Sequence, residues 1–321
     1  MRIPASVVGI TVGPREQEID ARWLMAYAAA LGERAPEYFD TTRPGGLLAH
    51  PLFPVCYEWP LALDVRAKAL PDDIAVRSVH ATHHLTLHRP PRVGDRLSTT
   101  ASVVALERRT PGAYLVLRME TVDATGRPVS TTDYGSLYLG VDCDGAPHLG
   151  PLPAGEREIV THSPQGEHAP TSPRGEHATL SPRRGRGQGE GWSDAEGWSW
   201  SVEVPIAPTL AHVYTECARI WNPIHTDRAV ALGAGLPDII LHGTATLALA
   251  ISQALARQPR APATTVRAVS CRFGAMVRLP SRLVVRGHAQ EPSPAGPVVR
   301  FEALAGDGRL AVRDARMVLA S

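Results

Sequence analysis

Acid–base chemistry is concentrated in the stretch RIWNPIHTD, residues 219–227, which holds an amide, an imidazole and a carboxylate. Its Asn222 is the only asparagine in the chain and lies three residues before His225. A histidine exchanges protons near neutral pH, and an adjacent amide can orient the reacting group. Each residue alone would also suit a structural role, since an asparagine before a proline favours a turn. Their combination points to a catalytic or binding loop.

The charge balance of the 321-residue chain argues against polyanionic partners, because 33 Lys and Arg residues face 32 Asp and Glu residues. We therefore expect a small molecule or another protein as partner, and neither nucleic acid nor a membrane surface. The only lysine is Lys68, and no glycine-rich loop precedes it. This excludes P-loop phosphoryl transfer and an obvious Schiff-base site.

The four cysteines are widely separated, with no C-x-x-C pair and no secretory signal before them. This pattern is typical of reduced thiols in the cytoplasm. Apolar stretches are interrupted well before the roughly 20 residues that a membrane helix needs. We expect a soluble, cytoplasmic protein.

A disordered linker is expected at residues 149–197, between two domains at residues 1–148 and 198–321. The segment is rich in Pro, Gly, Ser, Arg and Glu, so it cannot bury enough apolar surface to offset the entropy cost of ordering. It also repeats SPQGEHA as SPRGEHA. Its histidines lack the Cys or carboxylate ligands of a closed metal site, and we expect no metal there.

Both flanking regions follow the order helix, helix, antiparallel strands. In the first, residues 17–32 show helical apolar spacing, with Asp20 as N-cap and Gly32 as stop, and residues 53–65 form a second helix. In the second, residues 207–221 predict a helix, and the helix at 243–256 is apolar nearly all round and should be buried. Alternating strand patterns follow in each region. The economical interpretation is a duplicated α+β unit.

Resemblance to a known family begins at residue 218, with ARIWNPIHTDRAVALGAGLPDIILHGTATLALA. This stretch resembles the signature of the MaoC-like dehydratases, the family of (R)-specific enoyl-CoA hydratases and hydroxyacyl-ACP dehydratases. The signature is approximately S-G-D-x-N-P-I-H-x-D, then an Ala/Gly segment, then an H-G dipeptide that opens the central helix. The resemblance implies a double hotdog fold, with two antiparallel sheets that each wrap a central apolar helix and join into one larger sheet.

The resemblance also implies reversible addition of water to the α,β double bond of an acyl thioester. In that family the motif His and an Asp share the water or hydroxyl, the motif Asn positions them, and the glycine N–H stabilises the enolate. Here His225 becomes the acid–base residue, Asn222 the orienting amide and Gly243 the donor at a helix N-terminus. The substrate-binding residues that follow are Gly243, Thr244, Ile220 and His242, the last as a structural residue at the helix entrance.

One position departs from the family pattern, because the catalytic aspartate falls on Ile220, which cannot exchange a proton. Losing a positioned acid or base typically costs a factor of about 10² to 10⁴ in rate. Glu216 is the first candidate to replace it, since in a helix that extends to residue 220 the two side chains would share a face. Asp227 matches the family's second aspartate, for which we expect a structural role.

A second group of histidines occurs in VHATHHLTLH, residues 79–88. On a regular strand His80, His84 and His88 would share one face, and His83 the opposite one. A metal ion needs ligands within about 2.1 Å, whereas strand neighbours two apart are separated by roughly 7 Å. We expect a surface or cleft-lining role and no metal.

The sequence thus predicts a cofactor-independent hydro-lyase that acts on acyl-CoA or acyl-ACP thioesters in fatty acid metabolism, with a homodimer as its expected assembly. The alternatives are a non-catalytic acyl-thioester-binding or scaffolding protein that has lost the aspartate, and a thioesterase. Turnover of enoyl thioesters separates the hydro-lyase from the other two.

Overall fold

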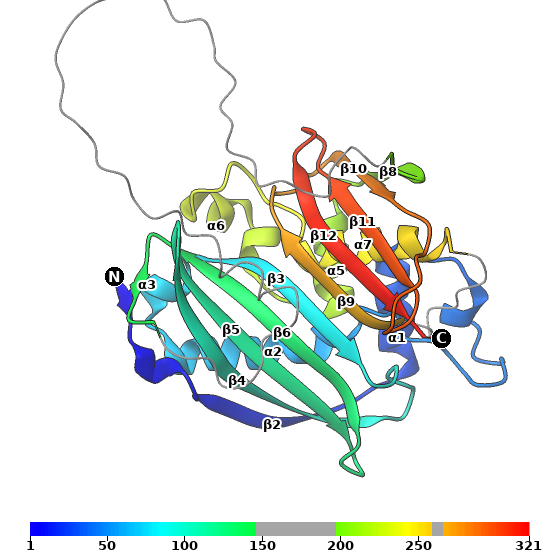
Figure 1. The fold of residues 1–321 in the computed structure, drawn as a ribbon, viewed down its shortest axis with the longest axis horizontal. Helices are drawn as coiled ribbons and strands as arrows, with labels where there is room; N and C mark the ends of the chain where they lie inside the picture. Colours follow the sequence, from blue (N-terminus) through cyan, green and yellow to red (C-terminus); the bar gives the residue numbers. More distant parts are fainter. Residues whose placement is uncertain (146–196, 259–265, 321) are drawn as a thin grey trace, which may run out of the picture.

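One ten-stranded antiparallel sheet dominates the fold, with the strand order β2-β4-β5-β6-β3-β9-β12-β11-β10-β8 (Figure 1). The computed structural model describes residues 1–145, 197–258 and 266–320. Apart from Gly197, the linker predicted at residues 149–197 lies outside the described residues. No helix in the described ranges is long and apolar enough to cross a membrane.

The N-terminal part of the chain supplies one half of this sheet and the long helix that packs against it. Its sheet strands are β2 (Thr11–Glu18), β3 (Ser78–Leu87), β4 (Arg96–Arg109), β5 (Gly112–Asp123) and β6 (Pro128–Leu139). A small parallel pair is formed by β1 (Arg2–Ile3) and β7 (Asp142–Cys143). The helical segments are η1 (Ala5–Val7), α1 (Ala21–Ala30), η2 (Pro36–Tyr38), α2 (Pro54–Ala69) and α3 (Asp72–Ala75).

The C-terminal part repeats this plan. Its strands are β8 (Trp200–Ile206), β9 (Val266–Phe273), β10 (Ser281–Gly287), β11 (Val298–Leu304) and β12 (Leu310–Leu319). Its helical segments are α5 (Leu210–Ala218), η3 (Pro223–His225), α6 (Arg228–Gly233) and α7 (Gly243–Leu255).

The two halves join where β3 pairs with β9, in a register that places Thr82 opposite Arg272 and Thr86 opposite Ala268. Helix α2 packs on β2 and β4, and α7 packs on β10, β11 and β12. Figure 1 shows both helices behind the same face of the sheet. The predicted double hotdog fold is confirmed, with both central helices on one side.

Local signals in the sequence explain the helix boundaries. The Asp20 carboxylate accepts a hydrogen bond from the Trp23 N–H at 2.7 Å, so it caps α1 as predicted. Gly32 follows α1 with a φ of 72°, a conformation that glycine adopts without a steric penalty. Helix α7 is buried along most of its length, as expected for a helix that is apolar on all sides.

A buried aromatic cluster joins the halves in the interior. The rings of Tyr27 and Tyr214 lie 5.7 Å apart, and Phe53 packs against Tyr27. All three side chains belong to one hydrophobic core that also contains most of α7. The halves therefore share a core in addition to a sheet.

The predicted faces of the histidine strand were wrong for His80 and His83. Strand β3 pairs with β6 through a register shift between His80 and Thr82, which is the position of a β-bulge. An extra residue reverses the alternation of side chains. The rings of His80 and His83 consequently lie 5.5 Å apart, and both line the cavity described below.

Candidate active site

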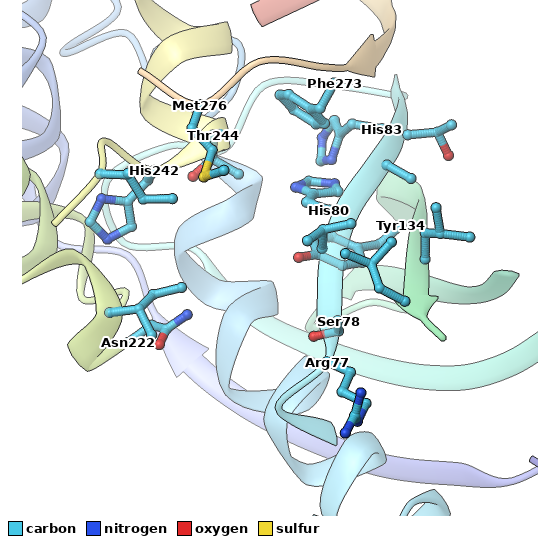
Figure 2. A pocket seen from close by; sticks show the side chains of 18 of the residues that line it. Arg77, Ser78, His80, His83, Tyr134, Asn222, His242, Thr244, Phe273 and Met276 are labelled. Atoms are coloured by element: carbon cyan, nitrogen blue, oxygen red, sulfur yellow. The ribbon is translucent and has the colours of Figure 1, made fainter. Parts of the chain in front are cut away.

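A cavity of about 2500 Å³ lies between the two halves and is lined by residues from both. The N-terminal half contributes one face of α2, the first residues of β3 and the turn between β4 and β5. The C-terminal half contributes the loop that carries Asn222 and His225, the start of α7 and residues 272–277. Figure 2 shows Asn222 and His242 on one side of this pocket, and His80, His83, Tyr134 and Phe273 on the other.

His225 is held in one tautomer by the backbone. It ends the short helix η3, and its Nδ1 lies 2.8 Å from the carbonyl oxygen of Ile240. A carbonyl only accepts hydrogen bonds, so Nδ1 carries the proton and Nε2 keeps its lone pair. Burial lowers the pKa of His225 to about 4. The imidazole is therefore neutral at pH 7, with a basic nitrogen on a residue that lines the cavity.

His242 stacks on His225, with ring centroids 3.7 Å apart. It is 2% exposed, and its Nε2 lies 3.2 Å from the hydroxyl of Thr215. Burial lowers the pKa of His242 well below its ordinary value. A neutral ring fixed in this way packs against the His225 ring and keeps its plane in place.

Gly243 is the first residue of α7, so its N–H points out of the helix without a partner in the helix itself. Among the described residues none accepts a hydrogen bond from this N–H. A Cβ at Gly243 would lie 3.4 Å from the Phe273 ring, which shows how closely the cavity wall approaches. The next residue, Thr244, accepts a hydrogen bond from the Tyr214 hydroxyl at 3.1 Å.

The position of the family aspartate is filled by an apolar side chain. Ile220 is 4% exposed and lines the cavity. It follows Arg219, which ends α5 with a φ of 57° and has its guanidinium over the Trp23 ring. The glycine of the family signature falls on Arg219, at a position where a left-handed backbone favours glycine.

The structure places Glu216 away from the cavity. Helix α5 ends at Ala218, so Glu216 and Ile220 do not share a helical face as the sequence suggested. The Glu216 side chain is exposed and lines a shallow depression beside Trp221 on the outer surface. This geometry is unfavourable for proton transfer at the cavity, because a catalytic group must lie within hydrogen-bond reach of the substrate.

Asn222 and Asp227 differ in what their side chains do. Asn222 lines the cavity, and no described residue forms a hydrogen bond with its amide. The Asp227 carboxylate accepts hydrogen bonds from the N–H groups of Ala229 and Val230 at 2.8 and 3.2 Å, so it caps α6. The amide is free to bind a ligand, whereas the carboxylate has the structural role that was expected.

Within the described part of the chain, all carboxyl groups that line the cavity belong to the N-terminal half. They belong to Glu58, Asp73 and Glu107. Burial raises the pKa of Glu58 to about 8, although hydrogen bonds from Thr132 and Ser130 oppose this shift. Glu58 is therefore protonated at pH 7. Sequence reasoning missed it, because an acid within an apolar helical pattern gives no sign that it faces a cavity.

Metal binding finds no support in the described ranges, where no three His, Cys, Asp or Glu side chains are grouped to hold an ion. Instead, a histidine base, a free amide and a helix N-terminus meet at one cavity in a double hotdog fold. These are the features that the sequence resemblance implied for the C-terminal half of the fold.

Two family descriptions match the chain. Residues 197–295 match the MaoC like domain, and residues 6–132 match the FAS1-like dehydratase domain region. The chain thus contains a MaoC-like dehydratase domain and a FAS1-like dehydratase region, and the first is the family that the sequence signature predicted.

Individual relatives are distant in sequence and similar in fold. A UPF0336 protein of Streptomyces coelicolor is 27% identical over 139 residues, which cover 41% of this chain and 91% of that protein. A MaoC-like dehydratase from Phytophthora capsici superposes with a TM-score of 0.76 at 17% identity, covering 99% of this chain and 97% of the other. A Mycobacterium tuberculosis protein with a double hotdog fold gives 0.58 at 18% identity, covering 98% and 96%. At these identities the solved structures establish the fold alone.

Proposed function

We propose that this protein is a hydro-lyase that adds water to the α,β double bond of an acyl thioester, or removes it in reverse. The observation that carries the proposal is the 2.8 Å hydrogen bond from His225 Nδ1 to the Ile240 carbonyl. It leaves Nε2 as the base on a residue that lines a cavity large enough for a thioester. The MaoC-like domain of the chain supports the same reaction class.

In the hydration direction, His225 Nε2 accepts a proton from water while the water oxygen bonds to the β carbon. The π electron pair moves onto the thioester oxygen, where the Gly243 N–H and the positive end of α7 stabilise the enolate. The imidazolium then delivers a proton to the α carbon, which restores the base and completes the addition of one water. Asn222 orients the water with its free amide.

The lowered pKa of His225 affects the two proton transfers in opposite ways. A base with a pKa of about 4 is weak when it accepts a proton from water. Its conjugate acid is correspondingly strong when it protonates the enolate. Without an aspartate at position 220, no nearby carboxylate of this loop stabilises the imidazolium, so we expect turnover below that of an enzyme with the complete pair.

The test is the loss of the enoyl-thioester absorbance band with a panel of short, medium and dicarboxylic enoyl-CoAs. We expect turnover by the wild type and a loss of about 10² to 10⁴ in kcat for His225→Ala. His88→Ala is the matched control, because His88 is exposed directly after β3 and lies outside the cavity. Equal turnover by both variants would remove His225 from the mechanism.

A non-catalytic acyl-thioester-binding protein is the second candidate, favoured by the buried isoleucine at position 220. Ile220→Asp distinguishes the two, because it restores a carboxylate at the family's aspartate position, on the wall of the cavity that His225 and His242 also line. For a hydro-lyase we expect about a tenfold or larger gain in turnover, since a positioned acid or base contributes roughly 10² or more. Tight binding of acyl-CoA by wild type and variant, without turnover of any panel member, would assign the binding function.

A further inference from the structure

Arg66 of α2 is a half-buried cation on the cavity wall without a carboxylate partner. Its Nη2 donates to the Tyr134 hydroxyl at 3.2 Å, and its guanidinium lies 5.5 Å from the ring centroids of both Trp59 and Tyr134. Its Nε has no hydrogen-bond partner and is sheltered from water. In the described part of the chain no Asp or Glu forms an ion pair with it.

Three other half-buried arginines have a carboxylate partner, whereas Arg313 on the same cavity wall forms no ion pair with a described residue and, like Arg66, has a buried Nε without a hydrogen-bond partner. Arg89 binds Asp95 at 2.7 Å, Arg118 binds Asp133 at 2.7 Å and Arg286 binds Glu302 at 2.6 Å. A buried guanidinium that lacks such a partner is unfavourable, because desolvation of a charge must be compensated. The difference suggests that Arg66 receives its anion from outside the chain.

Acidic side chains on the same cavity wall do not compensate Arg66. The Glu107 carboxylate pairs with Arg109, and Asp73 is exposed on α3. Glu58 is held by Thr132 at 2.7 Å and is protonated at pH 7. The positive charge of Arg66 is therefore left to the cavity.

A second donor lies beside the guanidinium. Trp59 lines the cavity seven residues before Arg66 on the same helix, and its Nε1–H is buried without a hydrogen-bond partner. An indole N–H can only donate. Together, Arg66 and Trp59 place a positive charge and two unpartnered donors beside the cavity, and a guanidinium can bind the oxygen atoms of an anion.

Contacts along the wall connect Arg66 to the proposed reaction centre. The Phe273 ring lies against Gly243, and 4.4 Å from the His80 ring. His80 stacks on Tyr134 at 3.8 Å, and Tyr134 accepts the hydrogen bond from Arg66. Along α2 itself, the cavity-lining residues extend from Val55 to Arg66, a length of roughly 16 Å at the rise of a helix.

We infer that Arg66 and Trp59 form an anion-binding subsite that recognises a charged group of the thioester substrate. The anion is a carboxylate at the far end of the acyl group or a phosphate of the carrier, which share the same oxygen chemistry. The inference rests on the proposed function for the identity of the substrate, whereas the subsite itself rests on a cavity-lining guanidinium that has tyrosine contacts but no carboxylate partner among the described residues.

Three saturated thioesters test the inference without any turnover, by isothermal titration calorimetry. The first is a methyl-terminated acyl-pantetheine without an anion, the second carries a terminal carboxylate on the same chain, and the third is the methyl-terminated acyl-CoA. For the wild type we expect one charged ligand to bind at least about tenfold more tightly than the neutral one, since hydrogen bonds to charged groups have this magnitude. The favoured ligand identifies the source of the anion.

Arg66→Met removes the charge at similar length, and Arg96→Met is the control, because Arg96 is exposed on β4 outside the cavity. We expect Arg66→Met to abolish the preference, Arg66→Lys to keep part of it and Arg96→Met to keep all of it. Since Arg66→Met leaves no carboxylate without a partner, it should unfold at no lower urea concentration than the wild type. The inference is overturned if the wild type shows no preference, or if Arg66→Met weakens all three ligands equally.

These outcomes are independent of the hydro-lyase assay. A charge-dependent preference together with no turnover of enoyl thioesters supports the subsite and rejects the proposed function. Turnover that depends on His225, with no preference among the three saturated ligands, supports the proposed function and rejects the subsite.

Discussion

The segment that follows α1 and the segment that follows α5 have the same backbone and different side chains. Residues 32–40 and 219–227 correspond at a constant spacing of 187 positions. Both begin with a left-handed residue, Gly32 with a φ of 72° and Arg219 with a φ of 57°. The same backbone hydrogen bonds form at equivalent positions of the two segments. For example, the Asp40 N–H donates to the Pro36 carbonyl and the Asp227 N–H donates to the Pro223 carbonyl, each at 2.8 Å.

In the family signature one segment carries both an aspartate and a histidine, whereas here each of the two segments keeps only one member of this acid–base pair. Glu33 stands at the position of Ile220, and Tyr38 at the position of His225. The N-terminal segment thus has a carboxylate without the histidine, and the C-terminal segment has the histidine without the carboxylate. The Glu33 side chain does not line the cavity. Its carboxylate instead accepts a hydrogen bond from the Ser252 hydroxyl at 2.5 Å.

The central helices differ in a corresponding way at their first residue. Helix α7 begins at Gly243, whose N–H is available to a ligand, whereas α2 begins at Pro54, which has no N–H. Instead, α2 presents Glu58, Trp59 and Arg66 to the cavity. The duplication therefore preserves the architecture in both halves, whereas the side chains that line the cavity differ between them. In the proposed function the C-terminal half supplies the reacting groups and the N-terminal half shapes the cavity.

Among substitutions that test the comparison of the two halves, the largest loss of kcat is expected when the start of α7 is made to resemble the start of α2. Gly243→Pro removes the N–H at the first helical position, where proline is compatible with a helix. His242 has a φ of −57° and a ψ of 138°, a conformation that a following proline allows. We expect a loss of about 10² to 10³ in kcat, the usual cost of removing one oxyanion donor.

Gly243→Ala is the matched control for that substitution. It adds a Cβ at 3.4 Å from the Phe273 ring but keeps the N–H. We expect a loss of less than about tenfold, measured in the same enoyl-thioester assay. An equal loss in both variants would mean that steric blockage of the cavity, and not the donor, explains the result.

A much smaller effect is expected from the N-terminal carboxylate. Burial raises the pKa of Glu33, and its hydrogen bond with Ser252 opposes this shift. Glu33→Gln preserves the shape and can still accept from the Ser252 hydroxyl, so we expect kcat to stay within about threefold of the wild type. A loss of about a hundredfold in a folded variant would show that the N-terminal segment takes part in the chemistry.

Much of the fold could be predicted from local patterns. Capping by Asp20, the stop at Gly32 and the apolar periodicity of residues 243–256 depend on neighbours in the sequence, and the structure confirms each of them. The duplicated order of elements and the family signature together predicted the double hotdog fold.

Features that depend on strand pairing or on exact helix ends could not be predicted. The bulge after His80 is defined by pairing with β6, and it brings His80 and His83 to the same cavity against the expected alternation. Glu216 was chosen on the assumption of a helix that continues to residue 220, whereas the left-handed Arg219 ends it earlier. Arg66 was missed because a charge in a helix acquires significance only when its surroundings are known.

The protonation state of His225 at neutral pH tests the central claim most directly. In ¹⁵N spectra of histidine-labelled protein, His225 can be assigned by its absence from the spectrum of His225→Gln. We predict a proton on Nδ1, a free Nε2 at pH 7 and a titration midpoint at about 4. Since the base must be unprotonated, kcat/KM should be maintained above this pH and fall as the pH decreases through it. A midpoint near the ordinary value of 6.5, or a proton on Nε2 at pH 7, would contradict the account.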